Sequence, residues 1–379
     1  MRFIVFGEDW GSHPSSTQHL FKALSKNNKV HWINSVGMRK PSINKTDIKR
    51  LIKKAWAIFA GAKKHVTNKP HHNLECVSNL LLLPWHDNKV IRAINKILFS
   101  LQVDPHHDDE AIIYWLSVPT AISLITPRAQ DKIIYYCGDD FSALAGVDHH
   151  MVAPLEQQLV EQADLIYVVS EKLQGKMPSN KTALLTHGVD FELFSEPKPA
   201  SHLLSNHTAK IGFYGSINEW LDIKLLIALA TQRPQYELYL VGALTRYTQD
   251  IKTLFSLPNV IHINAVEHCA LPRFSQHWQV SLLPFVDNAQ IRACNPLKLK
   301  EYLASGTPIV STHFPAVQHY NETLLIACDT EGFISRVDMA ICIAQFPSLN
   351  FKQSQTQLAL THSWQLKAQQ VSDMLASLD

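Results

Sequence analysis

The chain alternates short apolar runs with longer segments in which apolar residues recur every three or four positions. The short runs have the length of buried strands, and the longer segments have the period of amphipathic helices. Strands that alternate with helices form parallel sheets through right-handed crossovers, so we predict two such sheets. The predicted strands are Arg2–Phe6, Val30–Asn34, Ala111–Leu116, Lys132–Tyr136, Asp164–Val169 and Thr182–Leu185 in the first half, and Lys210–Tyr214, Glu237–Val241, Val260–Asn264, Val280–Leu283, Pro308–Ser311 and Leu324–Ala327 in the second.

A polar stretch at 196–208, which contains Pro197 and Pro199, separates the two halves and is typical of a linker. The pattern therefore predicts an α/β protein with two doubly wound domains. Parallel sheets of this kind bind ligands at the carboxyl ends of their strands, so we expect a ligand cleft between those ends.

Composition narrows the class of protein. The 379 residues are 46% apolar, which is enough for two cores, and the formal charge of +2 gives no general affinity for nucleic acid. The six cysteines lack metal-binding spacing, which indicates a reducing compartment. The N-terminal run predicts a strand rather than a signal sequence, and no apolar run approaches the roughly 20 residues that span a bilayer. We expect a cytoplasmic protein that is soluble or peripheral on the membrane.

The most informative segment is 295–310, which predicts a helix followed by a short buried strand. Pro296 is expected in the first helical turn, Lys298 lies within that turn, and Gly306 is the predicted stop. A helix start supplies free backbone N–H groups, and a lysine beside them adds a cation, which together suit a pyrophosphate. The alternative is an ordinary helix–strand unit whose lysine lies on a solvated face.

Several further segments, in their order and spacing, resemble glycosyltransferases with two Rossmann-like domains, the GT-B type. Within that type the chain most resembles the bacterial cell-surface polysaccharide branch, which includes the teichuronic-acid enzymes and the xanthan glucuronosyltransferase. The matching segments are Ala163–Ile166 through Ser170, His187–Asp190 with Phe194, Gly212–Ile217 with Trp220, Leu257–Val260, Leu283–Phe285 and 295–310.

The resemblance implies an N-terminal acceptor-binding domain at 1–196, to which a C-terminal helix at 350–379 returns, and a nucleotide-sugar donor domain at 209–349. It implies transfer of a hexosyl or glucuronosyl group from a nucleotide sugar, in particular a UDP-sugar, to a glycan or lipid-linked acceptor. It also implies that no metal or cofactor is needed, because cations and helix ends do that work.

Candidate donor-binding residues lie in the second half. Gly215 and Ser216 follow a strand as a turn of small residues, which lets backbone approach a ligand closely. Pro296, Leu297 and Lys298 would hold the diphosphate, with Lys298 stabilising the leaving nucleotide. Glu301, one turn later, could accept hydrogen bonds from ribose hydroxyls, or be a surface glutamate near lysines. By the resemblance, Glu267 occupies the position that recognises the base.

The candidate catalytic residues follow from one difference between this chain and the wider superfamily. Retaining members of the wider superfamily carry a glutamate eight positions before the equivalent of Glu301, where this chain has Ala293. This favours an inverting mechanism, which needs a general base for the acceptor hydroxyl. Asp139 and Asp140 follow the predicted strand Lys132–Tyr136, and either could be the base while the other orients substrate or caps a helix. Asp9 is a weaker candidate.

Two sets of histidines raise further possibilities. His13 and His19 flank the first predicted helix and are candidates for contact with a sugar, although a lone histidine is more often structural or solvated. The stretch Asp104–Glu110 is rich in histidine and acid, but consecutive ligands cannot all face one ion. We therefore predict no metal site.

Residues 38–69 carry ten lysines and arginines against one acid, Asp47. Within them, 48–59 predicts a basic amphipathic helix, which suits the anionic inner membrane surface. The basic and apolar stretch 90–99 supports the same interpretation. The alternative is that 48–59 packs on the sheet of the first domain.

Other functions remain open at this point. A nucleotide-sugar 2-epimerase of the same fold would have a soluble substrate and would leave the basic helix unexplained. A nucleotide-sugar-binding or scaffold protein without catalysis is the non-enzymatic alternative. A dinucleotide oxidoreductase is disfavoured because neither half carries G-x-G-x-x-G in its first strand–helix turn.

Overall fold

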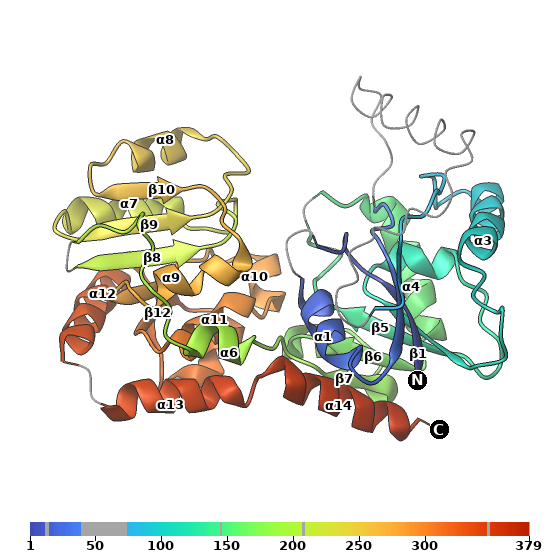
Figure 1. Cartoon of the computed structure of the whole chain (residues 1–379). Coiled ribbons are helices and arrows are strands. Elements are labelled where there is room, and N and C mark those ends of the chain that lie inside the picture. The colour runs from blue at the N-terminus through green and yellow to red at the C-terminus, as the bar shows by residue number, and fades with distance from the viewer. Residues whose placement is uncertain (12–14, 39–73, 145, 207–208, 347–348, 379) are drawn as a thin grey trace. The chain divides into compact units, whose positions relative to one another are not determined.

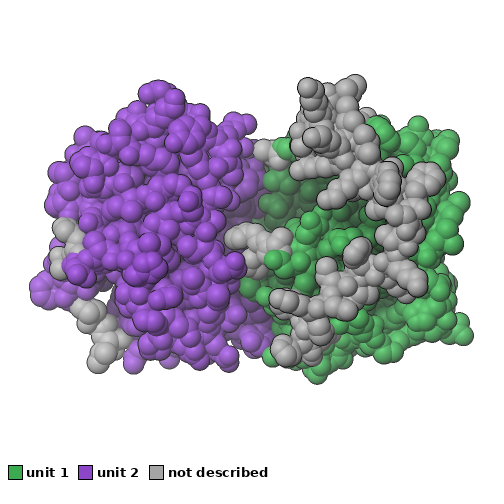
Figure 2. Space-filling model, turned by 45° about the horizontal axis from the view of Figure 1, so that its top comes forward, with its two compact units in different colours: residues 1–186, 368–379 green, residues 187–367 purple. Residues whose placement is uncertain are grey.

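The computed structural model describes residues 1–11, 15–38, 74–144, 146–206, 209–346 and 349–378 (Figure 1). The chain divides into two compact units (Figure 2). Unit 1 comprises residues 1–186 and 368–379, and unit 2 comprises residues 187–367. Each unit is built on one parallel sheet, as the alternating pattern predicts.

The described part of unit 1 holds a seven-stranded parallel sheet with the order β3-β2-β1-β4-β5-β6-β7. Its central strands are almost wholly apolar and buried, which is typical of a parallel sheet covered on both faces. The strand order reverses between β1 and β4, where such folds bind ligands. The elements are β1 (Arg2–Phe6), α1 (Ser16–Leu24), β2 (Lys29–Ile33), β3 (Cys76–Ser78), α3 (Lys89–Val103), β4 (Ile112–Leu116), η1 (Pro119–Ser123), β5 (Lys132–Cys137), α4 (His149–Gln162), β6 (Leu165–Val168), α5 (Glu171–Gln174), η2 (Ser179–Lys181) and β7 (Thr182–Leu184).

Unit 2 holds a six-stranded parallel sheet with the order β10-β9-β8-β11-β12-β13, which reverses between β8 and β11. Its elements are α6 (Phe191–Ser195), β8 (Lys210–Tyr214), α7 (Ile223–Gln232), β9 (Glu237–Val241), α8 (Gln249–Phe255), β10 (Val260–Ile263), η3 (His268–Ala270), α9 (Pro272–Ser275), β11 (Val280–Leu283), α10 (Ala289–Ala293), α11 (Leu297–Ser305), β12 (Ile309–Thr312), η4 (Pro315–Tyr320), β13 (Leu325–Ala327), α12 (Thr330–Gln345) and α13 (Leu349–Leu360). Helix α14 (Trp364–Ala376) begins in unit 2 and continues into unit 1.

Every predicted strand is present, with ends that agree to within one residue. The prediction missed β3, which pairs with β2 at the edge of the unit 1 sheet. All three residues of β3 are only half-buried at this edge. The strand is therefore short and lacks the apolar run by which the other strands were predicted.

The division between the units differs from the predicted domains of 1–196 with 350–379, and 209–349. The stretch 196–208 is not a free linker, because the backbone of Lys198 and Ser201 is hydrogen-bonded to Gln276 and Arg273 within unit 2. The chain instead passes from unit 1 into unit 2 directly after Thr186. The predicted C-terminal helix at 350–379 is two helices, α13 and α14. Helix α13 packs on α11 and α6 of unit 2, and only the end of α14 belongs to unit 1.

Candidate active site

Helix α11 starts one residue later than predicted, with Pro296 as its N-cap rather than in its first turn. No side chain of a described residue caps this end, so its first backbone N–H groups remain available to a ligand. Gly306 ends the helix in the left-handed conformation, with φ of 74°, as predicted. The helix start therefore has the features of an anion site.

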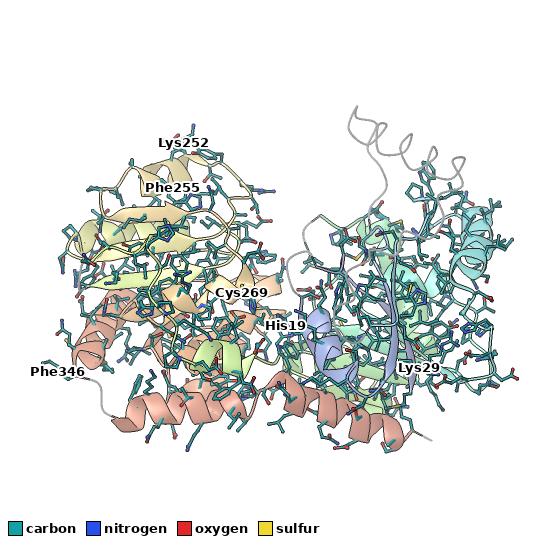
Figure 3. All side chains as sticks on the ribbon, in the orientation of Figure 1. His19, Lys29, Lys252, Phe255, Cys269 and Phe346 are labelled. Atoms are coloured by element: carbon teal, nitrogen blue, oxygen red, sulfur yellow. The ribbon has the colours of Figure 1, made fainter. Side chains whose placement is uncertain are left out.

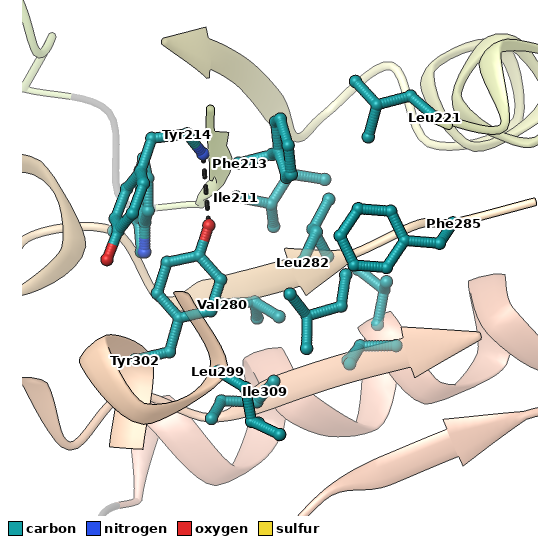
Figure 4. Close-up of a cluster of buried hydrophobic side chains, with 14 of the residues drawn as sticks. Ile211, Phe213, Tyr214, Leu221, Val280, Leu282, Phe285, Leu299, Tyr302 and Ile309 are labelled. Atoms are coloured by element: carbon teal, nitrogen blue, oxygen red, sulfur yellow. Dashed lines mark hydrogen bonds between the residues drawn. The ribbon is translucent and has the colours of Figure 1, made fainter. Parts of the chain in front are cut away.

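The core of unit 2 fixes the rotation of α11. Leu299 and Tyr302 are fully buried among apolar side chains of β8, β11 and β12 (Figure 4). The Tyr302 hydroxyl accepts a 3.1 Å hydrogen bond from the backbone N–H of Tyr214, at the end of β8. With these residues turned inward, Lys298 lies beside the end of β8.

Lys298 lies at the strand-order reversal between β8 and β11. Its Nζ is 5.4 Å from the ring centre of Phe213, on β8, and 5.5 Å from that of Phe285, just after β11. Gly215 makes room for it, because a Cβ there would lie 3.0 Å from the lysine Cε. Gly215 also has φ of +134°, which a residue with a side chain rarely adopts.

The Lys298 ammonium has no hydrogen bond or ion pair with another described residue, although the side chain is half-buried. Burial lowers the pKa of Lys298, and the negative charge of Glu301 opposes that shift. A half-buried ammonium has lost part of its hydration, and a charge-assisted contact with an anionic ligand compensates for that loss. Lys298 is therefore suited to bind phosphate.

Glu301 is buried, and both of its carboxylate oxygens are engaged within unit 2. Oε2 accepts a 2.8 Å hydrogen bond from the Tyr214 hydroxyl, and Oε1 lies 2.7 Å from Nε2 of His268. Sequence reasoning missed His268, whose position directly after Glu267 was the available signal. A ribose contact for Glu301 stays a prediction, and the described contacts tie its carboxylate to Tyr214 and His268.

The other predicted donor residues are at the same edge of the unit 2 sheet. Ser216 is exposed directly after Gly215, and Glu267 is exposed in the loop after β10, beside η3, which contains Cys269 (Figure 3). No contact joins either side chain to Lys298 among the described residues. Their roles in binding stay predictions.

In unit 1, Asp139 and Asp140 lie in the loop after β5 and have different surroundings. Asp140 is buried, bonded to Lys176 and to the backbone and hydroxyl of Ser142. Burial would raise the pKa of Asp140, but the hydrogen bonds from Lys176 and Ser142 outweigh it, and the pKa is lowered. Asp140 is thus held as a carboxylate within its own loop.

Asp139 is exposed at the surface, and its carboxylate makes no hydrogen bond to a described residue. Desolvation by the surrounding protein, followed by the negative charges of Glu8 and Asp140, raises its pKa to about 7. A carboxylate with a pKa near neutrality suits a general base.

Of the remaining predicted residues of unit 1, Asp9 lies in the loop after β1 and His19 lies on α1. Asp9 accepts hydrogen bonds from the backbone and hydroxyl of Ser35, so it ties two loops together. His19 is buried on α1 (Figure 3). His13 lies outside the described residues, and the role of either histidine toward a sugar stays a prediction.

Two acidic residues of 104–110 take part in ion pairs with basic side chains of unit 1. Arg2 donates to Asp108 at 2.6 Å, and Lys29 donates to Glu110 at 2.7 Å. In the part of the chain that the structure describes, no group of three or more His, Cys, Asp or Glu residues could hold a metal ion. Metal independence itself stays a prediction.

Ala293, the position at which the resemblance implies a glutamate in retaining enzymes, is the buried last residue of α10. Of the acids nearby in sequence, Asp287 is bonded to Arg292 through two hydrogen bonds of 2.6 and 2.7 Å.

No family model matches the chain. Among curated proteins, it is 26% identical over 283 residues to the "Putative teichuronic acid biosynthesis glycosyltransferase TuaH" of Bacillus subtilis, covering 69% of this chain and 71% of the relative. Sucrose-phosphate synthase from Thermosynechococcus elongatus superposes with a TM-score of 0.72 at 14% identity, over 100% of this chain and 98% of that one. Anabaena Alr3699/HepE, solved with UDP and glucose, superposes with a TM-score of 0.68 at 13% identity over the whole of both chains.

The fold is that of the GT-B glycosyltransferases. The predicted fold class is confirmed, and so is the resemblance to glycosyltransferases of bacterial cell-surface polysaccharide synthesis. No helix among the described residues is long and apolar enough to cross a membrane. The predicted membrane-contact segment 48–59 lies outside the described residues.

Proposed function

We propose that this protein transfers a sugar from a UDP-sugar to a glycan or lipid-linked acceptor in cell-surface polysaccharide synthesis, with inversion and without a metal ion. The observation that carries the proposal is the half-buried ammonium of Lys298, which lacks an ion-pair partner among the described residues and lies beside Gly215 at the uncapped start of α11. This arrangement suits the diphosphate of a nucleotide sugar. The structural neighbour HepE was solved with UDP and glucose, which favours uridine as the base.

Unit 2 would hold the donor. The N–H groups at the start of α11 and the Lys298 ammonium would bind the diphosphate and stabilise its charge as the sugar leaves. Glu301, held by Tyr214 and His268, would keep the helix start and Lys298 in place.

Unit 1 would supply the base. Asp139 would accept the proton of an acceptor hydroxyl while that oxygen bonds to the anomeric carbon and the bond from carbon to the diphosphate oxygen breaks. The raised pKa of Asp139 makes its carboxylate basic enough for this transfer, whereas Asp140 is engaged with Lys176. With Ala293 in place of a second glutamate in unit 2, a direct displacement with inversion is the consistent mechanism.

The test is calorimetric binding of UDP, GDP, ADP and their sugars, with either magnesium or EDTA present. We expect one nucleotide class, uridine, to bind equally in both conditions. Binding that needs magnesium would overturn the metal-free proposal, and binding of no nucleotide would overturn the donor site.

Product analysis then separates the chemistries. With a binding UDP-sugar and extracted glycan or lipid-linked acceptors, we expect UDP release and a glycoside of inverted anomeric configuration by NMR. Conversion of the free UDP-sugar without any acceptor would indicate the epimerase alternative. A retained configuration would overturn the assignment of Asp139 as the base.

A further inference from the structure

Helix α3 lies at the edge of unit 1 (Figure 1), and its buried residues, Asn95 and Phe99, share one face. Asn95 on this face is fully buried and bonds to both the backbone N–H and the carbonyl of Leu83, each at 2.8 Å. Phe99, one turn later, is buried with its ring centre 5.6 Å from that of Phe6 on β1. These contacts fix which side of α3 faces outward.

The outward side is apolar. Val90, Ile94, Ile97 and Leu101 have exposed fractions of 69%, 41%, 61% and 77%. Their spacing of four, three and four residues places them in one stripe along the helix, opposite Asn95 and Phe99. Because a surface helix normally turns polar side chains outward, this stripe calls for an apolar or amphipathic partner.

A row of cations lies on one side of the same helix. Lys89, Arg92 and Lys96 are spaced by three and four residues, which places them together between the outward apolar stripe and the buried face of Asn95 and Phe99. The sequence of α3 contains no acidic residue. Trp85, which precedes the helix, is also exposed, at 38%. An apolar stripe, a cationic flank and an aromatic residue at one end match a helix that lies in the plane of an anionic lipid surface.

We propose that the outer face of α3 binds an anionic membrane surface, with the Val90–Leu101 stripe inserted among the lipids and the Lys89–Lys96 row on their head groups. The cationic flank favours lipid over a second copy of this chain, because copies would bring two like-charged rows together. The inference rests on α3 alone and does not depend on the proposed sugar transfer.

The test is co-sedimentation of the full-length protein with vesicles of phosphatidylcholine alone or with added phosphatidylglycerol. We expect binding to the anionic vesicles that weakens as salt is raised. Lys89→Gln, Arg92→Gln and Lys96→Gln together should lower the partition coefficient at least 10-fold, since basic residues near an anionic surface are attracted to its head groups. Ile97→Ser with Leu101→Ser should lower it by a similar factor through lost apolar burial.

The matched control is Phe346→Ser with Leu366→Ser, which removes two apolar side chains of unit 2 that are 82% and 51% exposed. This control should bind vesicles as the wild type does. Thermal unfolding and UDP binding of each variant report separately on the fold and on the donor site.

Absent binding to anionic vesicles, or undiminished binding by both α3 variants, would overturn the inference. The second result would move the membrane contact to another part of the chain. If the wild type is a dimer in sedimentation velocity and Ile97→Ser with Leu101→Ser makes it a monomer, the stripe is a protein interface, which also overturns it.

Discussion

In unit 1 two neighbouring aspartates follow β5, and in unit 2 two lysines lie two positions apart in the first turns of α11. One member of each pair is engaged within the protein: Asp140 with Lys176 and Ser142, and Lys300 with Asn295 and the ring of Tyr320. The other member, Asp139 or Lys298, has no ion-pair partner among the described residues.

The two lysines of unit 2 differ in their surroundings. Lys300 is fully buried, and burial together with the charge of Lys367 lowers its pKa to about 7. Lys298 is half-buried beside a glycine, where a ligand can reach it. Each pair therefore leaves one charge without an ion-pair partner among the described residues, the proposed base Asp139 in unit 1 and the proposed diphosphate-binding Lys298 in unit 2. Each of the following experiments removes or alters one of these two charges or its surroundings.

Replacing the base should have the largest effect. We expect Asp139→Asn to lower kcat by about 10²- to 10⁴-fold, the usual contribution of a general base, with UDP affinity unchanged. Steady-state kinetics measures the change in kcat, and calorimetry measures the UDP affinity. Asp109→Asn, an exposed carboxylate elsewhere in unit 1, is the control, and wild-type turnover in Asp139→Asn would remove that residue from catalysis.

The pH profile should show the same group. Asp139 acts as a base only when deprotonated, so with its pKa raised to about 7 the rate should be half-maximal near pH 7, level off above it and fall below it. From the plateau down to pH 5 the expected fall in kcat/KM is roughly 100-fold, one decade per pH unit below the pKa. A profile that stays flat down to pH 5 would contradict the raised pKa.

On the cationic edge, Lys298→Met keeps the aliphatic stem and removes the charge. We expect UDP affinity to fall by about 1–2 kcal/mol, the scale of one charge-assisted contact. Lys252→Met, which neutralises an exposed lysine on α8 (Figure 3), should bind UDP as the wild type does. Equal affinities in the two variants would remove Lys298 from the donor site.

Gly215→Ala should have the smallest effect. An alanine at φ of +134° is strained, and its Cβ would press on Lys298, so we expect a loss of about 1 kcal/mol in the free energy of unfolding and weaker UDP binding. Denaturant unfolding and calorimetry check it. Gly175→Ala, at φ of −67° and with 3.6 Å to the nearest atom, should cost less than Gly215→Ala.

The sequence by itself determined the described strands other than β3, and the helix that carries Lys298. These depend on local patterns: an apolar run specifies a buried strand, and Gly306 stops a helix wherever it packs. The sequence also placed Asp139 and Asp140 at the carboxyl end of β5, because a loop after a parallel strand must open at that edge.

Only the tertiary structure decided which charge of each pair is free. Asp140 is neutralised by Lys176, which is 36 residues away in the chain, and Glu301 is engaged by His268 at a separation of 33 residues. The tertiary structure also decided the division between the units. The stretch that follows Glu196 belongs to unit 2 because its backbone is hydrogen-bonded to Gln276 and Arg273. Contacts between residues distant in sequence leave no periodic signal along the chain, so only packing of the folded units could reveal them.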